Sequence, residues 1–330
     1  MPNLPKENED IKLSNNLCQI VIQVNSKFKT SDNGWKIDFN NKTKNNQDKK
    51  KNKLKEEFEI EVHYKKDISS KKIRLLGNKF YERYKSESIS IEISNQSIGL
   101  KEFVDIEELK LENNVPLIAK IKIAKYLDNL NYMFADCKDI DYIIGLDKLV
   151  NEKVTNISNM FLNCTSLSRI NNLNKFNTKN VRNMNSMLRD CTNLESLPEL
   201  FNFNTENVND MTSLFYNCKN LKGINLTKWD TKNVRFLSGI FYGCSKLETI
   251  SNNVSRFNVS KVENMSLMFY RCEKLEKLDL STFNTQNVKK MKGLFYGCYN
   301  LKEINGLEKF NTNNLTDMSS LFYECKSLNS

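Results

Sequence analysis

The sequence predicts an α/β solenoid preceded by a small β-rich unit, and three observations support this prediction. The pattern Val-x-x-Met-x-x-Met/Leu-Phe-x-x-Cys-x-x-Leu-x-x-Ile/Leu returns every 26 to 28 residues. Within each copy, the apolar spacing changes from helix-like to strand-like, and upstream of the copies most apolar clusters have strand-like spacing. A fixed period of this length is typical of repeats that bury their apolar faces only against each other. The copies begin at Leu127, Val154, Val181, Val208, Val234, Val262, Val288 and Leu315.

Composition restricts the functional classes. The chain has 330 residues and a formal charge of +10, but residues 1–55 hold 12 Lys against 6 acidic residues, and residues 127–330 hold 25 basic against 21 acidic residues. The repeats are therefore nearly balanced, which does not favour nucleic acid as a partner. No secretory signal and no apolar run of about 20 residues is apparent. We expect a cytoplasmic or other intracellular protein, with the cell surface as the alternative.

The first two segments differ sharply in composition. Residues 1–39 are expected to form N-terminal β-strands, at 11–25 and 35–39, because apolar residues cluster or alternate there. Residues 40–55 contain seven Lys and a single aliphatic residue, Leu54. Such a segment cannot bury enough apolar surface to become ordered, so we expect a disordered loop. Its charge leaves open an association with nucleic acid, an anionic lipid surface or a nuclear-import receptor.

Residues 56–116 are predicted to be a β-rich capping unit. Alternating apolar residues predict strands at 57–64 and 88–94, and residues 71–84 predict a short strand followed by a helical turn. The same alternation at 117–123 leads directly into the repeats. A cap is physically required, because the first repeat would otherwise expose its apolar face.

Residues 117–330 are predicted to be a solenoid of about eight repeats. In the copy that begins at Val262, the residues Val262, Met265, Met268 and Cys272 have the spacing of one face of a helix or of tight helical turns. Leu278 and Leu280 then alternate around Asp279, as in a short strand, and a turn follows. Each repeat should therefore contain a strand, a turn and a short helix. Strands of successive repeats should pair in parallel into one continuous sheet on one side, with short helices on the other.

These repeats resemble a known family. The segment Phe283–Cys298 has the form Phe-Asn-Thr-x-Asn-Val-x-x-Met-x-x-Leu-Phe-x-x-Cys, which is similar to the 26-residue repeat of the BspA-like leucine-rich repeat family. The resemblance covers roughly Leu117 to the end of the sequence. It implies a leucine-rich-repeat-like right-handed superhelix with a parallel sheet, and a role in holding other macromolecules. Bacterial members are often exported, adhesin-like surface proteins, which supplies the alternative to an intracellular protein.

Eight of the nine cysteines recur in register with the repeats. Stacked copies would lie about 5 Å apart, which is within disulfide range, but each Cys also suits a narrow buried layer. We expect buried thiols, with disulfides as an alternative; metal binding is disfavoured because Cys-x-x-Cys pairs are absent. Cys18 lies outside this series and is expected in a buried strand. The eight are Cys137, Cys164, Cys191, Cys218, Cys244, Cys272, Cys298 and Cys325.

Two further residue sets have structural interpretations. The asparagines that precede the repeat Val are expected to hold turns and to hydrogen-bond from repeat to repeat. His63, the only histidine, is expected to be an exposed strand residue, so no His-dependent catalytic site is predicted. We expect no enzyme activity, no cofactor and no metal site. The asparagines are Asn180, Asn207, Asn233, Asn287 and Asn314.

The function most consistent with this pattern is a scaffold that binds a protein partner. Solvent-facing strand and turn residues vary between repeats whereas the core does not, which suits recognition. The final repeat lacks a polar cap, so we also expect self-association at that end. The candidate partner-binding residues, which we term the strand-side surface, are Glu195, Glu199, Lys222, Asn225, Lys228, Glu248, Glu276, Lys277, Asp279, Lys302, Glu303 and Asn305.

Overall fold

The computed structural model describes residues 57–85, 89–110, 115–124, 127–149, 152–252 and 257–328. These residues belong to one compact unit, Lys55–Ser330. The predicted strands at 11–25 and 35–39, Cys18 and the predicted loop at 40–55 lie outside the described residues.

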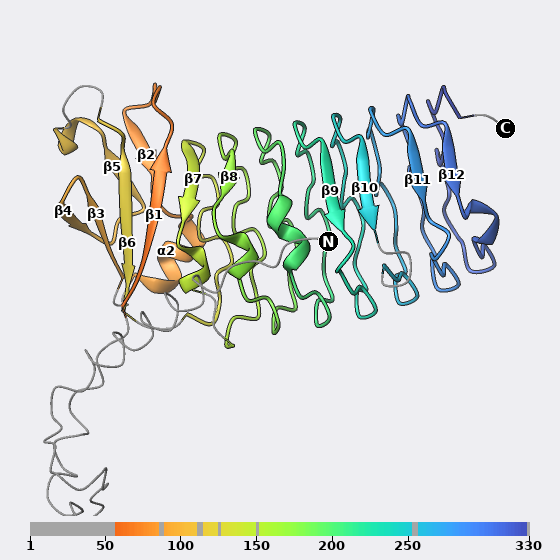
Figure 1. The fold of residues 1–330 in the computed structure, drawn as a ribbon, viewed down its shortest axis with the longest axis horizontal. Coiled ribbons are helices and arrows are strands. Elements are labelled where there is room, and N and C mark those ends of the chain that lie inside the picture. Colours follow the sequence, from red (N-terminus) through yellow and green to blue (C-terminus); the bar gives the residue numbers. More distant parts are fainter. Residues whose placement is uncertain are drawn as a thin grey trace, which may run out of the picture. The chain divides into compact units, whose positions relative to one another are not determined.

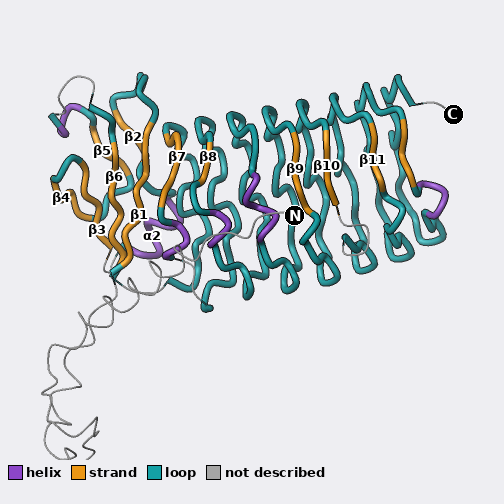
Figure 2. The backbone as a smooth tube through the Cα atoms, in the orientation of Figure 1, coloured by secondary structure: helices purple, strands orange, loops and turns teal. Residues whose placement is uncertain are grey.

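The described structure consists of short strands, few helices and many turns that repeat along the chain (Figures 1 and 2). The α-helix is α2 (Asn78–Tyr84), and the 3-10 helices are η2 (Glu107–Leu109), η3 (Leu146–Lys148), η4 (Leu173–Lys175), η5 (Pro198–Asn202) and η6 (Leu307–Lys309). The strands are β1 (Phe58–Tyr64), β2 (Lys72–Arg74), β3 (Ile89–Ile93), β4 (Gln96–Gly99), β5 (Phe103–Asp105), β6 (Ile118–Ile123), β7 (Ile140–Ile144), β8 (Arg169–Ile170), β9 (Gly223–Leu226), β10 (Thr249–Asn252), β11 (Lys277–Asp279) and β12 (Glu303–Asn305).

A six-stranded open sheet joins the segment before the repeats to the first two repeats. Its order is β4-β3-β6-β1-β7-β8, and β1 pairs antiparallel with both β6 and β7. The strands predicted at 57–64, 88–94 and 117–123 are thus confirmed as β1, β3 and β6. Alternate residues of β1, namely Ile60, Val62 and Tyr64, are buried as the pattern predicts. Because β7 belongs to the first repeat, β1 covers the edge that β7 would otherwise expose.

The short strand and helical turn predicted at 71–84 are confirmed as β2 and α2, and α2 packs against the first repeat. Gly77 precedes the helix, and its N–H donates to the carbonyl of Met133 at 2.9 Å. A Cβ atom at position 77 would collide with the carbonyl of Tyr132, so this approach requires glycine. Phe80 of α2 is fully buried.

In the described repeats, the segment that begins at the repeat Val forms tight turns, one of the two predicted alternatives, and not a short helix; the 3-10 helices η3 to η6 lie elsewhere in the repeats. Residues 262–272 form consecutive tight turns, in which Leu267 and Arg271 adopt left-handed backbone conformations with φ of 61° and 54°. Within these turns, the N–H of Met268 donates to Met265, three residues earlier, at 3.3 Å. The intervening N–H groups donate to the next repeat instead, as that of Phe269 does to Leu294 at 2.9 Å. Successive turns of this kind place apolar side chains at nearly the spacing of a helix face, which explains the prediction.

The prediction of one continuous strand-side sheet is also wrong. In the described repeats the strands form three separate parallel pairs, β7 with β8, β9 with β10, and β11 with β12. In the repeat between β8 and β9, η5 begins at Pro198, which has no N–H for a ladder, and Ser196 makes only a single bridge to Gly223.

The eight repeats are instead linked continuously at a different position, the second residue after the repeat Val. Parallel bridges join neighbouring repeats there along the whole array. We term this series the bridge column. Its members are Asn129, Asn156, Asn183, Asp210, Phe236, Asn264, Lys290 and Asp317.

The core is made of like side chains stacked from repeat to repeat. Phe269 is 1% exposed and lies between Phe241 and Phe295, at ring-centroid distances of 5.8 and 5.7 Å. Leu188 occupies the same position in the repeat that begins at Val181 and is also fully buried. The apolar frame predicted from the sequence is therefore the core of the described repeats.

Candidate functional site

The strand-side surface lies on and beside the short strands of the repeats, and all its residues except Glu199 are exposed. Backbone hydrogen bonds between neighbouring repeats align the first strand-side residue of each repeat in one row. The N–H of Glu248 donates to the carbonyl of Lys222 at 2.8 Å, and that of Lys302 to the carbonyl of Glu276 at 2.8 Å. Asp279 stands opposite Asn305 in the β11–β12 register. The structure thus places these residues in rows across neighbouring repeats.

Half of the strand-side residues are paired with each other. Oppositely charged side chains on successive repeats form three ion pairs: Glu195 with Lys222 at 2.8 Å, Glu276 with Lys302 at 2.9 Å, and Lys277 with Glu303 at 3.0 Å. The hydrogen bond from Lys222 lowers the pKa of the Glu195 carboxyl, and the same bond raises the pKa of Lys222. Both charges therefore persist at neutral pH, and the three ion pairs place a cation beside an anion on neighbouring repeats.

The side chains of four other strand-side residues form hydrogen bonds within their own repeat or to a neighbouring one. Each side chain bonds as follows: Asn225 accepts from the N–H of Thr227 at 3.0 Å, Asp279 from Ser281 at 2.9 Å, and Glu199 from Asn174 at 3.1 Å, while Lys228 donates to Asn202 at 3.2 Å. The hydrogen bonds from Ser281 lower the pKa of Asp279. Asn225 and Asp279 thus hold turns, whereas Glu199 and Lys228 link neighbouring repeats, so a substitution at any of the four would test folding and binding together.

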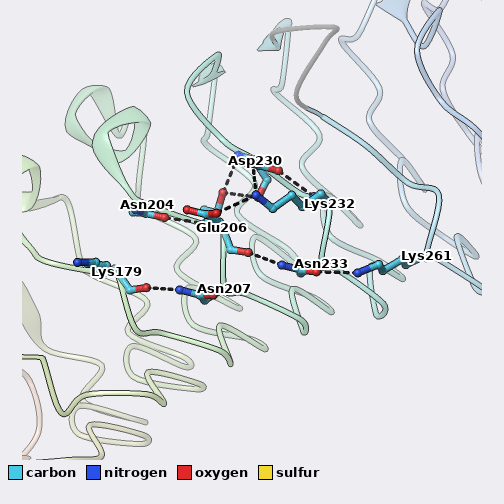
Figure 3. A network of polar contacts seen from close by, with 9 residues as sticks. Lys179, Asn204, Glu206, Asn207, Asp230, Lys232, Asn233 and Lys261 are labelled. Atoms are coloured by element: carbon cyan, nitrogen blue, oxygen red, sulfur yellow. Dashed lines mark hydrogen bonds and ion pairs between the residues drawn. The ribbon is translucent and has the colours of Figure 1, made fainter.

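The turn asparagines hydrogen-bond from repeat to repeat, as predicted. The side-chain amide of Asn207 donates to the carbonyl of Lys179 at 2.8 Å, and that of Asn233 to Glu206 at 2.8 Å (Figure 3). Lys261 occupies this position in the next repeat, and its ammonium donates to the Asn233 side chain at 2.7 Å. The amides of Asn180, Asn287 and Asn314 make the equivalent bonds, at 2.9, 2.6 and 2.6 Å.

The repeat cysteines are unpaired thiols, and they also link neighbouring repeats. The Sγ of Cys244 donates to the carbonyl of Phe215 in the preceding repeat at 3.0 Å, and that of Cys272 to Phe241 at 3.3 Å. Burial raises the pKa of the Cys244 thiol to about 12. Because the thiolate is the nucleophilic form, these buried cysteines are chemically inert in the folded protein.

Alkylation of the native protein is expected to modify Cys325 well before the other seven repeat cysteines. Cys325 is only half-buried, whereas Cys137 to Cys298 are buried. Iodoacetamide labelling at neutral pH, with timed quenching and peptide mass spectrometry, gives the rate for each thiol. Equal rates at Cys218 and Cys325 would contradict the burial. Labelling after unfolding without reductant should count nine thiols, and a lower count would indicate disulfides.

A row of tyrosines was missed by the sequence analysis. Each follows a core Phe or its equivalent, and the rings of Tyr242 and Tyr270 stack with centroids 4.5 Å apart and planes parallel. Burial, followed by the hydrogen bond with Tyr216, raises the pKa of Tyr242 to about 12. The recurrent Phe-Tyr dipeptide was the available sequence signal. The row, which the guanidinium of Arg189 covers at one end, comprises Tyr216, Tyr242, Tyr270, Tyr296 and Tyr323.

His63 is a strand residue, as predicted, but it is not exposed. Its side chain is 13% exposed and stacks on the ring of Tyr142 in β7, with centroids 4.1 Å apart. The neighbouring strand covers it, which alternation within β1 alone could not indicate. In the described part of the chain, no group of three His, Cys, Asp or Glu side chains is arranged to hold a metal ion.

The chain matches a described protein family. A family model described as "Mycoplasma protein of unknown function, DUF285" matches residues 128–249 and 220–330. No curated protein and no solved structure matches the chain. None of the helices in the described residues has the length and apolar character needed to span a membrane.

Proposed function

The chain belongs to the DUF285 family, and we propose that it is a non-enzymatic scaffold that binds a protein partner through the strand-side surface. In this proposal the repeats form a right-handed solenoid of the BspA-like leucine-rich repeat type. The observation that carries the proposal is the contrast between a fixed internal frame and exposed residues that change from repeat to repeat. The Phe, Cys and Leu positions are buried alike, whereas the exposed row of Lys222, Glu248 and Glu276 holds a cation in one repeat and an anion in each of the next two.

Swapping the partners of the three strand-side ion pairs is expected to weaken capture of the partner strongly. The swaps exchange Glu195 with Lys222, Glu276 with Lys302 and Lys277 with Glu303, so each pair persists while the surface pattern inverts. A partner that matches this pattern should bind about tenfold more weakly or worse, which corresponds to about 1.4 kcal/mol. Affinity capture with the full chain, followed by titration of the captured protein, measures the loss.

The control is the swap of Glu206 and Lys232, which also pair across repeats, at 2.8 Å, but lie in the turn network of Figure 3, where Lys232 pairs with Asp230 as well, at 3.3 Å. This variant should bind like the natural chain. Equal binding by the strand-side swap, with an unchanged melting temperature, would rule out the strand-side surface as the contact site.

Self-association is also part of the proposal. In the last described repeat, Met318 and Tyr323 are 58% and 55% exposed, whereas Met291, the equivalent of Met318 one repeat earlier, is 1% exposed. A second copy of the chain could cover these side chains in the way that each repeat covers its neighbour.

A further inference from the structure

The bridge column contains two departures from an otherwise uniform structural role. At six of its eight positions, an Asn or Asp side chain accepts a hydrogen bond from the backbone N–H two residues later and so fixes the turn. Phe236 and Lys290 occupy the other two positions and carry no acceptor for this bond. The six bonds are those of Asn129 (3.0 Å), Asn156 (2.9 Å), Asn183 (2.9 Å), Asp210 (2.9 Å), Asn264 (2.9 Å) and Asp317 (3.0 Å).

Phe236 stabilises the isolated chain less than an Asn or Asp would at this position. It gives up the turn-fixing bond and leaves its ring 54% exposed, whereas rings of the phenylalanine stack such as Phe241 and Phe269 are buried. A position that breaks a local structural rule without a compensating contact in the fold is expected to serve a functional purpose.

Both departures line the same surface hollow. It has a volume of about 700 Å³ and extends over the repeats that begin at Val234, Val262 and Val288. The two exceptional residues, Phe236 and Lys290, stand on either side of Asn264 in the bridge column. Their coincidence at one hollow indicates a single site rather than two independent irregularities.

The hollow is strongly basic. Arg235, Lys261, Lys289 and Lys290 line it, and Glu263 is the only acidic residue among its described lining. Lys289 pairs with Glu263 at 2.8 Å, and this hydrogen bond lowers the pKa of the Glu263 carboxyl. Three cations are thus in excess around one exposed aromatic ring.

Lys261 adds to this charge by replacing a turn asparagine. Its ammonium is held by the side chain of Asn233, as Figure 3 shows, and it lines the hollow together with Asn287 of the next repeat. Lysine also occurs at this position as Lys153, in another repeat. What distinguishes Lys261 is that it lines the same hollow as Phe236 and Lys290.

We infer that this hollow binds an acidic peptide segment of a protein partner, with an apolar side chain against Phe236 and carboxylates on Arg235, Lys261 and Lys290. The inference rests on the proposed function in taking the partner to be a protein. Charge complementarity selects an acidic occupant. An exposed aromatic side chain in a concave, charged surround suits one apolar anchor residue.

Single-stranded nucleic acid is the less favoured occupant. Binding of that kind uses a basic groove that follows the backbone, together with several rings for successive bases. Here one exposed ring carries the site, and the repeats as a whole hold 25 basic against 21 acidic residues.

The test uses the full chain and labelled peptides of Asp and Glu with one central Phe. Binding by fluorescence anisotropy should weaken about tenfold when the central Phe becomes Ser, and should weaken at high salt. Phe236→Asn should also reduce the affinity about tenfold, while the melting temperature stays equal or rises, because Asn restores the bond made elsewhere in the column. Lys290→Asn should likewise weaken peptide binding and leave the melting temperature equal or higher.

The matched control is Lys292→Asn, which removes an exposed cation of the same repeat that does not line the hollow. It should leave the peptide affinity within about twofold. Unchanged affinity in Phe236→Asn, equal binding of the Ser peptide, or tighter binding of oligo(dT) or oligo(U) than of any acidic peptide would each overturn the inference.

The two proposals fail separately. Absence of peptide binding, combined with loss of partner capture in the strand-side swap, would overturn the hollow and support the strand-side surface. Loss of capture in Phe236→Asn but not in the strand-side swap would support the hollow and overturn the strand-side assignment.

Discussion

Raising the pH from about 8 to about 10 is expected to destabilise the repeats steeply, because buried thiols cannot ionise while the chain is folded. Burial raises the pKa of seven repeat thiols above the ordinary value of 9.0, and Cys244 is one of them at about 12. In the unfolded chain the same thiols ionise near pH 9. The others are Cys137, Cys164, Cys191, Cys218, Cys272 and Cys298.

The direction of this pH dependence follows from the number of protons that the folded and unfolded chains hold. Below pH 9 both states keep their thiol protons, so the stability is fully present. As the pH rises above this value, the unfolded chain loses protons that the folded chain retains, and the free energy of unfolding falls. Each thiol contributes about 1.4 kcal/mol per pH unit, so cooperative unfolding of all seven repeats would give a slope of roughly 10 kcal/mol per unit.

Urea unfolding curves at several pH values, followed by circular dichroism, measure this slope. Cys244→Ala should reduce the slope by the contribution of one proton, whatever the variant does to the baseline stability, because each buried thiol adds its own proton to the slope. Cys325→Ala is the matched control and should change it far less, because Cys325 is half-buried. A free energy of unfolding that is the same at pH 8 and pH 10 would show that the thiols are not buried.

Removing one ring from the phenylalanine stack is expected to destabilise the folded chain strongly. Phe269→Ala should lower the free energy of unfolding by about 3–5 kcal/mol, because the cavity lies between two rings that cannot close over it. Phe241 and Phe295 are held in place by their own repeats, and each loses its stacking partner.

Phe269→Leu is the matched control and should cost less than about 1.5 kcal/mol. The chain already contains this arrangement, since Leu188 fills the equivalent position and its carbonyl still accepts the thiol of Cys218 at 3.1 Å. Urea unfolding at neutral pH compares the two variants. Equal losses for Ala and Leu would mean that the ring stack, and not merely a filled volume, determines the stability.

Several features could be predicted because they depend on the side chain and its period alone. The burial of Met265 and Cys272 follows from apolar residues that return at fixed intervals. The bonds of Asn207 and Asn233 follow from the preference of asparagine for turns, combined with stacking. Strand β1 follows from strict alternation, although the cover that Tyr142 gives to His63 comes from another strand.

The candidate sites were only partly predictable. The exposure of the strand-side residues follows from the pattern, but the pairing of Lys222 with Glu195 depends on which repeats are neighbours in register. The hollow at Phe236 was missed because a single apolar residue at an exposed position resembles ordinary variation. Its meaning appears only when Lys261 and Lys290 are seen to line the same surface.

The repeat period establishes that like repeats stack and which side chains they bury, because a fixed apolar period allows few other ways to remove those side chains from water. Contacts between repeats determine whether each repeat forms a helix or a series of turns. Apolar residues three apart suit both, and the outcome depends on whether alternate N–H groups, such as that of Phe269, bond within the repeat or to the next one. That choice is made by a neighbour about 26 residues away, which local spacing cannot specify.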